Sequence, residues 1–535
     1  MTAVAGEAST ASNPRTTPSP RWFLVGLVLV AAVATSIRVV NVTVWRPTCT
    51  DDLVAAAEDG RLEVFNTSPG GCFAVRNDSL YGHLQGRLLA EGHGYVDVFT
   101  WIRTGGERYE PSANDAPLYA AVLAVPSALG LTDATDHRLV SAGIGVLGVV
   151  LIGLLGRRLA GERAGLIAAG LAAVYPMLWI NDGMLLVDGL AATLAAAAML
   201  MAYRWWDRPT WPRAIGLGLV IGLAGLARAE LFMLEVLVVV PLAWGINRLA
   251  GPRRTVGQVV AIWAVGALLL TPWIAYNLGR FEEPVLMTTG TGAVLSAASC
   301  DSGFSGPFLG YQPESCFEEY LAQGYADGWP DPDRLDEAQR DAVAREAALS
   351  YLSDHLDRVP VVVLARVGRM WDLYRPDQNT ELNWFIEGRD KWASDAGVRM
   401  YAVLLPVGAV GLWILRRRRL PLSPLVGPAV AVSVTAAMVY GLTRYRVPAD
   451  VALCVLAGVA VDALLRRRWA GRPARTRSVD GRIGAGAGAG GAGRSPRPDA
   501  AHAPGLDPAA LILPTSPVHG PLGDEPDPSP PRGSP

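Results

Sequence analysis

The stretch WFLVGLVLVAAVATSIRVVN, residues 22–41, is apolar over almost its whole length. About 20 apolar residues in a helix are enough to cross the hydrocarbon core of a bilayer. The run follows a short tail rich in Pro, Ser and Thr, and no convincing small-residue cleavage site ends it. We therefore expect a retained membrane-spanning helix here rather than a cleaved signal peptide.

Further apolar runs of spanning length follow along the chain. The 535 residues are 51% hydrophobic and 18% charged, with a mean hydropathy of +0.26 and a net charge of −2. This composition predicts an all-α polytopic membrane protein with sizeable loops, because it is too apolar for most soluble proteins and too charged for a bare bundle of spans. About ten transmembrane helices are expected, at residues 22–41, 139–156, 164–180, 188–206, 214–229, 231–247, 257–276, 398–415, 424–442 and 448–465.

Arginine clusters mark alternate ends of these runs. Cytoplasmic loops of membrane proteins are enriched in Lys and Arg, so these ends are expected to be cytoplasmic. Both termini are then cytoplasmic, and the loops 42–138 and 277–397 lie outside. The clusters are at residues 157–158 and 163, at 204, 208 and 213, at 248 and 253–254, at 416–419 and at 466–468.

The five cysteines agree with this sidedness. Cys49 and Cys72 belong to the first outer loop, and Cys300 and Cys316 belong to the second. Disulfides form in oxidising compartments, so one bridge within each loop is expected. The alternative is that these four are free thiols. Cys454 falls inside an apolar run, where we expect a buried thiol.

Several segments are not expected to span the membrane. The short apolar segments 117–131 and 359–371 are predicted to be helices at the outer interface, because a full span at either position would move arginine clusters to the outer side. Segment 336–357 has the pattern of an amphipathic helix. After residue 469 the composition turns to Gly, Ala, Pro, Ser and Arg, which predicts a disordered tail.

Polar residues collect at the expected outer ends of the spans, in four clusters that are far apart in the sequence. Charged groups at one membrane level suggest a shared polar site. The clusters are Asp78, Tyr81 and His83; Asp182 and Asp188; Arg228 and Glu230; and Arg444 and Arg446.

These clusters fit the transfer of a group from a lipid-linked phosphate. The arginines Arg228, Arg444 and Arg446 are suited to hold a phosphate by charge-assisted hydrogen bonds. A carboxylate can take the proton of an acceptor hydroxyl, and a further carboxylate pair, Asp182 with Asp188, can hold a divalent cation such as Mg²⁺ or Mn²⁺. Zinc-site spacing and nucleotide-binding motifs are absent from the sequence.

Each candidate also has a structural explanation. The aspartates of the first two clusters can cap helices or form turns. The third cluster can be an ion pair at the membrane edge, and the arginines of the fourth can anchor the interface. The histidine of the first cluster can be a helix-surface residue. Both kinds of explanation stay open at this point.

The order of several short motifs resembles the GT-C glycosyltransferases, polytopic enzymes that use polyprenyl-phosphate sugars. The chain is most similar to the branch of protein O-mannosyltransferases and lipid A aminoarabinose transferases, in an actinobacterial form. The matching pieces include Asp78-x-x-Tyr81, Gly92-His93-Gly94-Tyr95, Pro117-Leu118-Tyr119, Asn181-Asp182-Gly183, Ala227-Arg228-Ala229-Glu230, Gly290-Thr291-Gly292 and Tyr445-Arg446-Val447-Pro448.

The resemblance implies a GT-C fold and roles for particular residues. It makes Asp78 the catalytic base, and it makes Asp182 and Asp188 the second acidic group of the site. Tyr81, His83 and Glu230 are then expected to contact substrate, and the three arginines are expected to hold the donor phosphate. The implied reaction inverts the anomeric carbon and moves a mannose- or arabinose-like sugar.

The expected partners are a polyprenyl-phosphate sugar, membrane lipids and an extracytoplasmic glycan, lipid or protein acceptor, with no nucleic acid. The expected location is a bacterial plasma membrane with the active site on its outer face. Two other classes remain open: a lipid or sugar transporter or flippase, and a non-catalytic envelope-assembly protein. The expected domains are a cytoplasmic tail 1–20, a catalytic module 21–276, an outer loop 277–397, C-terminal spans 398–468 and a cytoplasmic tail 469–535.

Overall fold

The structure is a computed structural model that describes residues 20–49, 71–313, 315–316 and 335–470. The described residues form helices, together with two isolated β-bridges that join Thr48 to Phe73 and Val96 to Pro111. This confirms the predicted all-α class. The predicted disorder of the C-terminal tail falls almost entirely outside the described residues.

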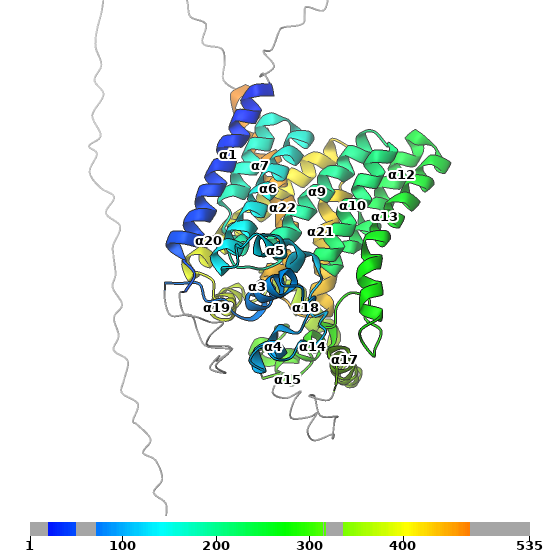
Figure 1. Cartoon of the computed structure of the whole chain (residues 1–535). Helices are drawn as coiled ribbons and strands as arrows, with labels where there is room; N and C mark the ends of the chain where they lie inside the picture. Colours follow the sequence, from blue (N-terminus) through cyan, green and yellow to red (C-terminus); the bar gives the residue numbers. More distant parts are fainter. Residues whose placement is uncertain (1–19, 50–70, 314, 317–334, 471–535) are drawn as a thin grey trace, which may run out of the picture. The chain divides into compact units, whose positions relative to one another are not determined.

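Each expected span is helical in the structure (Figure 1). The helices at the positions of the expected spans are α1 Pro20–Val40, α6 Ala134–Ala160, α7 Glu162–Val174, α8 Pro176–Asp182, α9 Asp188–Asp207, α10 Trp211–Ala227, α11 Leu234–Leu237, α12 Val239–Ala250, α13 Pro252–Leu278, α20 Lys391–Arg417, α21 Ser423–Met438 and α22 Val447–Ala470.

Fewer of these helices than expected meet the length and apolarity that a span requires. Six helices in the described parts of the chain do so, or seven if α7 and α8 together form one broken span. The apolar helices α10 and α21 have 17 and 16 residues and are shorter than a full span. The multi-pass character is therefore confirmed, with a smaller number of spans by this measure than the predicted ten.

The helical run 164–180 is bent by 58° where α7 meets α8. Pro176 begins α8, and Tyr175 before it has an extended backbone with ψ of 113°. Proline cannot donate the hydrogen bond that would continue α7, and it disfavours helical geometry in the preceding residue. The bend brings the polar end of α8, with Asn181 and Asp182, into the protein interior.

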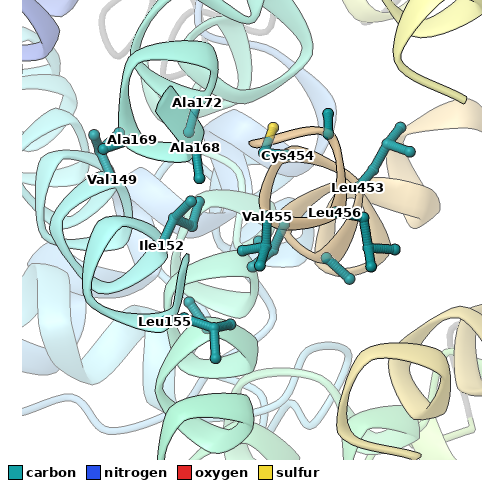
Figure 2. Packing of buried hydrophobic residues seen from close by; sticks show 14 of the residues in the cluster. Val149, Ile152, Leu155, Ala168, Ala169, Ala172, Leu453, Cys454, Val455 and Leu456 are labelled. Carbon is teal, nitrogen blue, oxygen red and sulfur yellow. The ribbon is translucent and has the colours of Figure 1, made fainter. Parts of the chain in front are cut away.

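The largest core cluster surrounds α22, which contacts α6, α7, α9, α20 and α21. Figure 2 shows Ile152 of α6, Ala168 and Ala172 of α7, and Val455 of α22 in this cluster. Small side chains on α7 let the helices approach closely, as they do in other membrane helix pairs. Where α20 crosses α22, Gly411 lies directly against the backbone of Leu456.

Arginines gather at one end of the spanning helices. Arg158 at the end of α6 pairs with Asp207 at the end of α9. Arg466 of α22 donates to the carbonyl oxygen of Ala160 at 3.3 Å, and Arg213 of α10 donates to that of Arg204 at 2.7 Å. Three of the five predicted arginine clusters, at 157–163, 204–213 and 466–468, therefore share one level, as the positive-inside rule requires.

The remaining helices cover the opposite end of the spanning helices (Figure 1). The predicted interfacial segments are helical there as α5 and α18, and the predicted amphipathic segment is helical as α17. The set comprises α3 Asn77–Ala90, α4 Val98–Arg103, α5 Leu118–Ala128, α14 Thr291–Ser296, α15 Asp301–Phe304, α17 Glu337–Asp354, α18 Val359–Met370 and α19 Pro376–Glu387.

Two disulfides close segments at this end. Cys49 is bonded to Cys72 and Cys300 to Cys316, with Cα–Cα distances of 5.1 and 5.3 Å. Cys454 is a buried free thiol. The predicted bridges are confirmed, and the alternative of four free thiols is wrong.

The close crossing of α20 and α22 gives a stability prediction. A methyl group added at Gly411 would overlap the carbonyl oxygen of Leu456, and overpacking of this kind costs about 1–3 kcal/mol. Gly411→Ala is therefore expected to lower the thermal unfolding midpoint in detergent. Gly170→Ala is the control, because no atom lies within 4 Å of the added carbon. Equal midpoints for the two variants would contradict this packing.

Candidate active site

A cavity of about 370 Å³ lies among α3, the start of α5, the start of α9 and the segments around residues 228, 290 and 444. Its volume is within the range of about 300–1,000 Å³ that is usual for small-molecule sites. Its charged lining side chains are Asp78, Asp115, Asp188, Arg228, Glu230 and Arg444. Five of these six belong to the clusters predicted from the sequence.

Asp78 lies in the first turn of α3 and forms an ion pair with Arg444. Arg444 Nη2 lies 2.5 Å from Asp78 Oδ2. The Asp78 side chain is 56% exposed, because it faces the cavity. The start of α3 is instead capped by hydrogen bonds between Arg76 and Ser79, so the alternative that Asp78 is the N-cap is wrong.

The ion pair fixes the protonation of Asp78. The guanidinium of Arg444 lowers the pKa of Asp78 below its ordinary value, and the charge of Arg228 acts in the same direction. An opposite charge at this distance favours the ionised carboxylate. Asp78 is therefore an anion at neutral pH and a weak base.

Arg228 joins two carboxylates at the end of α10. Its Nη1 lies 2.5 Å from Asp188 Oδ1, and its Nε lies 2.6 Å from Glu230 Oε1. The backbone is extended at Arg228, and the 3₁₀ helix Ala229–Met233 follows directly. This change of direction brings the side chain of Glu230 next to that of Arg228. The predicted ion pair is present, and it lies in the cavity lining.

The ring of Tyr445 lies against both cavity arginines. The guanidinium carbon of Arg228 is 4.7 Å from the ring centroid, and that of Arg444 is 5.7 Å from it. The Tyr445 hydroxyl donates to the hydroxyl of Tyr440 at 2.9 Å. Each of these cation–π contacts is attractive, and the cavity thus presents two guanidinium groups beside one aromatic ring.

The segment 112–115 supplies cavity residues that the sequence analysis did not select. Ser112 accepts or donates a hydrogen bond of 2.5 Å with the hydroxyl of Tyr81, a predicted substrate contact that lines the cavity. Asp115 follows, three residues before α5. The motif Pro117-Leu118-Tyr119 lies two residues further on and was the signal that could have drawn attention to Asp115.

Asp115 differs from Asp78 in its ionisation. Its surface faces the cavity, but the surrounding protein weakens its solvation. This burial raises the pKa of Asp115 to about 7, and the negative charge of Asp78 acts in the same direction. The two aspartates of one cavity are therefore held in different protonation states near neutral pH.

Asp182 does not line the cavity. It is buried and pairs with Arg38 of α1, whose Nε lies 2.7 Å from Asp182 Oδ2. Gly145 and Gly189 lie against its carboxylate, and a side chain at either position would overlap it. The structure thus gives Asp182 a packing environment between helices, and its predicted contact with substrate or a cation is not part of this geometry.

Arg446 and His83 also lie outside the cavity lining. Arg446 is fully buried, 2.9 Å from Asp372 and 3.2 Å from Asp450. His83 is buried, and its Nδ1 lies 3.0 Å from Nδ1 of His137. Burial lowers the pKa of His83 to about 3, so the ring is neutral at physiological pH. These surroundings are those of structural residues.

The predicted cation pair is divided between two arginines. Asp182 is bound to Arg38, whereas Asp188 is bound to Arg228. In the described parts of the chain, no three His, Cys, Asp or Glu side chains are placed to hold a metal ion together. The residues present do not form a ready cation site, so we derive no step through one.

The comparison with protein families bears on these residues. Residues 114–276 match the family model of dolichyl-phosphate-mannose-protein mannosyltransferases. The match covers less than a third of the chain and confirms the predicted resemblance there. It includes Asp115, Asp188, Arg228 and Glu230, and it ends before Arg444.

Solved structures give weaker likenesses. The archaeal oligosaccharyltransferase AglB from Archaeoglobus fulgidus, in complex with an inhibitory peptide and a dolichol-phosphate, is 18% identical with a TM-score of 0.47, over 85% of this chain and 52% of that chain. ArnT from Cupriavidus metallidurans, bound to undecaprenyl phosphate, is 15% identical with a TM-score of 0.35, over 83% of this chain and 78% of that chain. The chain thus spans about half the length of the oligosaccharyltransferase. No curated protein matches it.

The buried pair of Asp182 gives a second prediction. Asp182→Asn removes the countercharge of buried Arg38, and breaking a buried pair costs about 3–5 kcal/mol. We expect a large fall in the unfolding midpoint. Asp207→Asn is the control, because the pair of Asp207 with Arg158 is about one third exposed and such pairs contribute about 1 kcal/mol or less. Unchanged stability of Asp182→Asn would contradict a structural role for this pair.

Proposed function

We propose that this chain is a membrane glycosyltransferase that moves a sugar from a polyprenyl phosphate to an acceptor. The observation that carries the proposal is one cavity lined by two arginines and several carboxylates at the end of the spanning helices that lies opposite the arginine clusters. The family-model match over residues 114–276 supports the same class. The transferred sugar is mannose- or arabinose-like.

The two cavity arginines are the proposed ligands of the donor phosphate. Arg228 and Arg444 contact the same ring, that of Tyr445, so one phosphate group can meet both. Guanidinium groups bind phosphate by paired, charge-assisted hydrogen bonds. Asp188 accepts a hydrogen bond from Arg228 and Asp78 accepts one from Arg444, and these ion pairs hold both guanidinium groups at the cavity.

Sugar transfer in this cavity needs one proton acceptor and one leaving group. The acceptor hydroxyl attacks the anomeric carbon on the side opposite the phosphate, which inverts its configuration. The bond from that carbon to the phosphate oxygen breaks, and its electron pair leaves with the polyprenyl phosphate. The hydroxyl proton passes to a cavity carboxylate, the function that the resemblance assigns to Asp78.

The orientation that we propose puts this cavity on the outer face of a bacterial plasma membrane. Both termini are then cytoplasmic, because the arginine-rich helix ends face the cytoplasm. The two disulfides near the cavity end fit an oxidising compartment. The acceptor is accordingly an extracytoplasmic glycan, lipid or protein. A transport function would place its polar residues near mid-membrane, and the cavity residues lie at a helix end.

Sugar transfer by membranes that contain Asp78→Asn tests the proposal. The substitution removes the cavity carboxylate that holds Arg444, and the loss or misplacement of a group in the site costs about 100-fold in rate. The measurement uses radiolabelled polyprenyl-phosphate mannose and polyprenyl-phosphate arabinose at matched protein levels. Glu91→Gln, an exposed carboxylate at the other end of α3, is expected to keep the wild-type rate. Transfer equal to wild type in Asp78→Asn would remove Asp78 from the reaction.

A second test concerns the donor phosphate. Arg228→Gln removes charged hydrogen bonds worth about 1.5–3 kcal/mol each, which corresponds to a rise of about 10- to 100-fold in the donor KM. Arg213→Gln, at the opposite end of the helices, is the control and is expected to leave KM unchanged. A normal donor KM in Arg228→Gln would show that the phosphate binds elsewhere.

A further inference from the structure

Among the described residues that line the cavity, Asp115 is the carboxylate that forms no ion pair with an arginine. Asp78 is paired with Arg444, and Asp188 is paired with Arg228. Glu230 also binds Arg228. Among the described residues, Asp115 forms neither an ion pair nor a hydrogen bond, and it lies in the cavity lining. Its carboxylate oxygens are therefore available to a substrate without the prior opening of a salt bridge.

The backbone before Asp115 is held from several sides. The N–H of Ala113 donates to Glu337 at the start of α17, at 3.0 Å. The carbonyl oxygen of Ala113 accepts from the N–H of Thr289 at 2.9 Å, and that of Ser112 accepts from Arg280 at 2.7 Å. These hydrogen bonds hold the backbone that leads to Asp115, which limits how far its carboxylate can move away from the cavity.

Two residues after Asp115, the ring of Pro117 restricts the backbone at the start of α5. The segment is thus constrained on both sides of the carboxylate. Its anchors come from α17 and from residues 280–289, which belong to the second large loop. The second loop therefore helps to build the cavity, because it fixes the position of a first-loop carboxylate.

The charges that face Asp115 come from four elements. Asp78 of α3 and Glu337 of α17 disfavour its ionisation, whereas Arg444 and Arg228 favour it. Burial and the two negative charges prevail, and the pKa of Asp115 is about 7. A general base is most effective when its pKa lies near the working pH. Asp78, with a pKa lowered by Arg444, holds a proton much less readily.

We propose that Asp115 receives the proton of the acceptor hydroxyl, and that Asp78, held by Arg444, is a positioning residue. The proposal rests on the proposed function and deepens it, because it assigns the base of the same cavity. It differs from the assignment to Asp78 that the resemblance implies. Its basis is the juxtaposition, in one cavity, of an unpaired carboxylate next to an anchored backbone segment with a carboxylate that is paired.

Every bond, electron pair and proton of the proposed transfer step is accounted for by the substrates and the cavity carboxylates. The acceptor oxygen forms a bond to the anomeric carbon while the bond from that carbon to the phosphate oxygen breaks. The electron pair of the broken bond leaves with the polyprenyl phosphate, and the hydroxyl proton goes to the carboxylate of Asp115. The carboxylic acid that results loses its proton to solvent before the next turnover. The negative charge of Asp78 raises the proton affinity of Asp115 during the step.

The pH dependence of transfer tests the assignment. Only the ionised carboxylate accepts a proton, so wild-type kcat/KM is expected to rise with pH through an apparent pKa near 7. Asp115→Asn is expected to lose this rise and to transfer about 100-fold more slowly at pH 7.5 or above. Asp115→Glu is expected to restore part of the rate together with the rise. An unchanged rise in Asp115→Asn would overturn the proposal.

Two further variants are expected to shift the pH at which kcat/KM rises, in opposite directions. Asp78→Asn removes a negative charge that raises the pKa of Asp115. The kcat/KM that this variant retains is therefore expected to rise at lower pH than in the wild type. Arg444→Gln removes a positive charge that lowers that pKa, so the rise moves to higher pH. A merely structural effect of either substitution would change the rate without these opposite shifts. Loss of the rise in Asp78→Asn with its retention in Asp115→Asn would make Asp78 the base.

A measurement without activity separates this inference from the proposed function. The infrared difference spectrum of wild type minus Asp115→Asn is expected to show a carboxylic-acid band that titrates near pH 7. A wild-type chain that fails to transfer from either donor would contradict the proposed function. Transfer by the wild type, with no such band and no change of the pH rise in Asp115→Asn, would contradict this inference alone.

Discussion

The ion pair between Asp78 and Arg444 joins parts of the chain that are 366 residues apart. Asp78 lies in the first turn of α3, whereas Arg444 lies in the turn just before α22, the helix around which the largest core cluster packs. The pair closes one side of the cavity. It also affects the chemistry there. Arg444 binds Asp78 directly, whereas Asp115 forms no direct ion pair among the described residues, although the charge of Arg444 still favours its ionisation.

The helices were predictable because the physical requirement for crossing a membrane is simple. A run of apolar residues needs a helix to satisfy its backbone, and arginines at alternate ends indicate sidedness. The number of spans was less predictable. The runs that contain α10 and α21 continue in the sequence, but the helices end early where the chain turns toward the cavity, as at Arg228. The hydrophobic periodicity of the sequence does not show where these helices end at the site.

The candidate site shows the same limit at the level of single residues. Arg444 and Arg446 are two positions apart in a 3₁₀ turn, and one lines the cavity while the other is buried with Asp450. Asp182 and Asp188 likewise separate, since the turn between α8 and α9 sends one to Arg38 and the other to Arg228. The sequence indicates that these polar residues share a membrane level. Whether each side chain faces the cavity or the protein interior depends on the conformation of a single turn, which the sequence pattern does not show.

Asp115 was not selected because its importance comes from what surrounds it. An isolated aspartate in a loop resembles any solvated residue, and the partners that fix it come from residues 280, 289 and 337. Two aspartates in one cavity cannot both be ionised without cost unless each has a cation. Arg444 stabilises the ionised form of Asp78 by direct contact. Ionisation of Asp115 beside that negative charge is less favourable, so the pKa of Asp115 is the one that is raised. The cavity thereby keeps one carboxylate as a fixed anion and the other as a group that takes up and releases a proton near neutral pH, which is the division that acid–base catalysis requires.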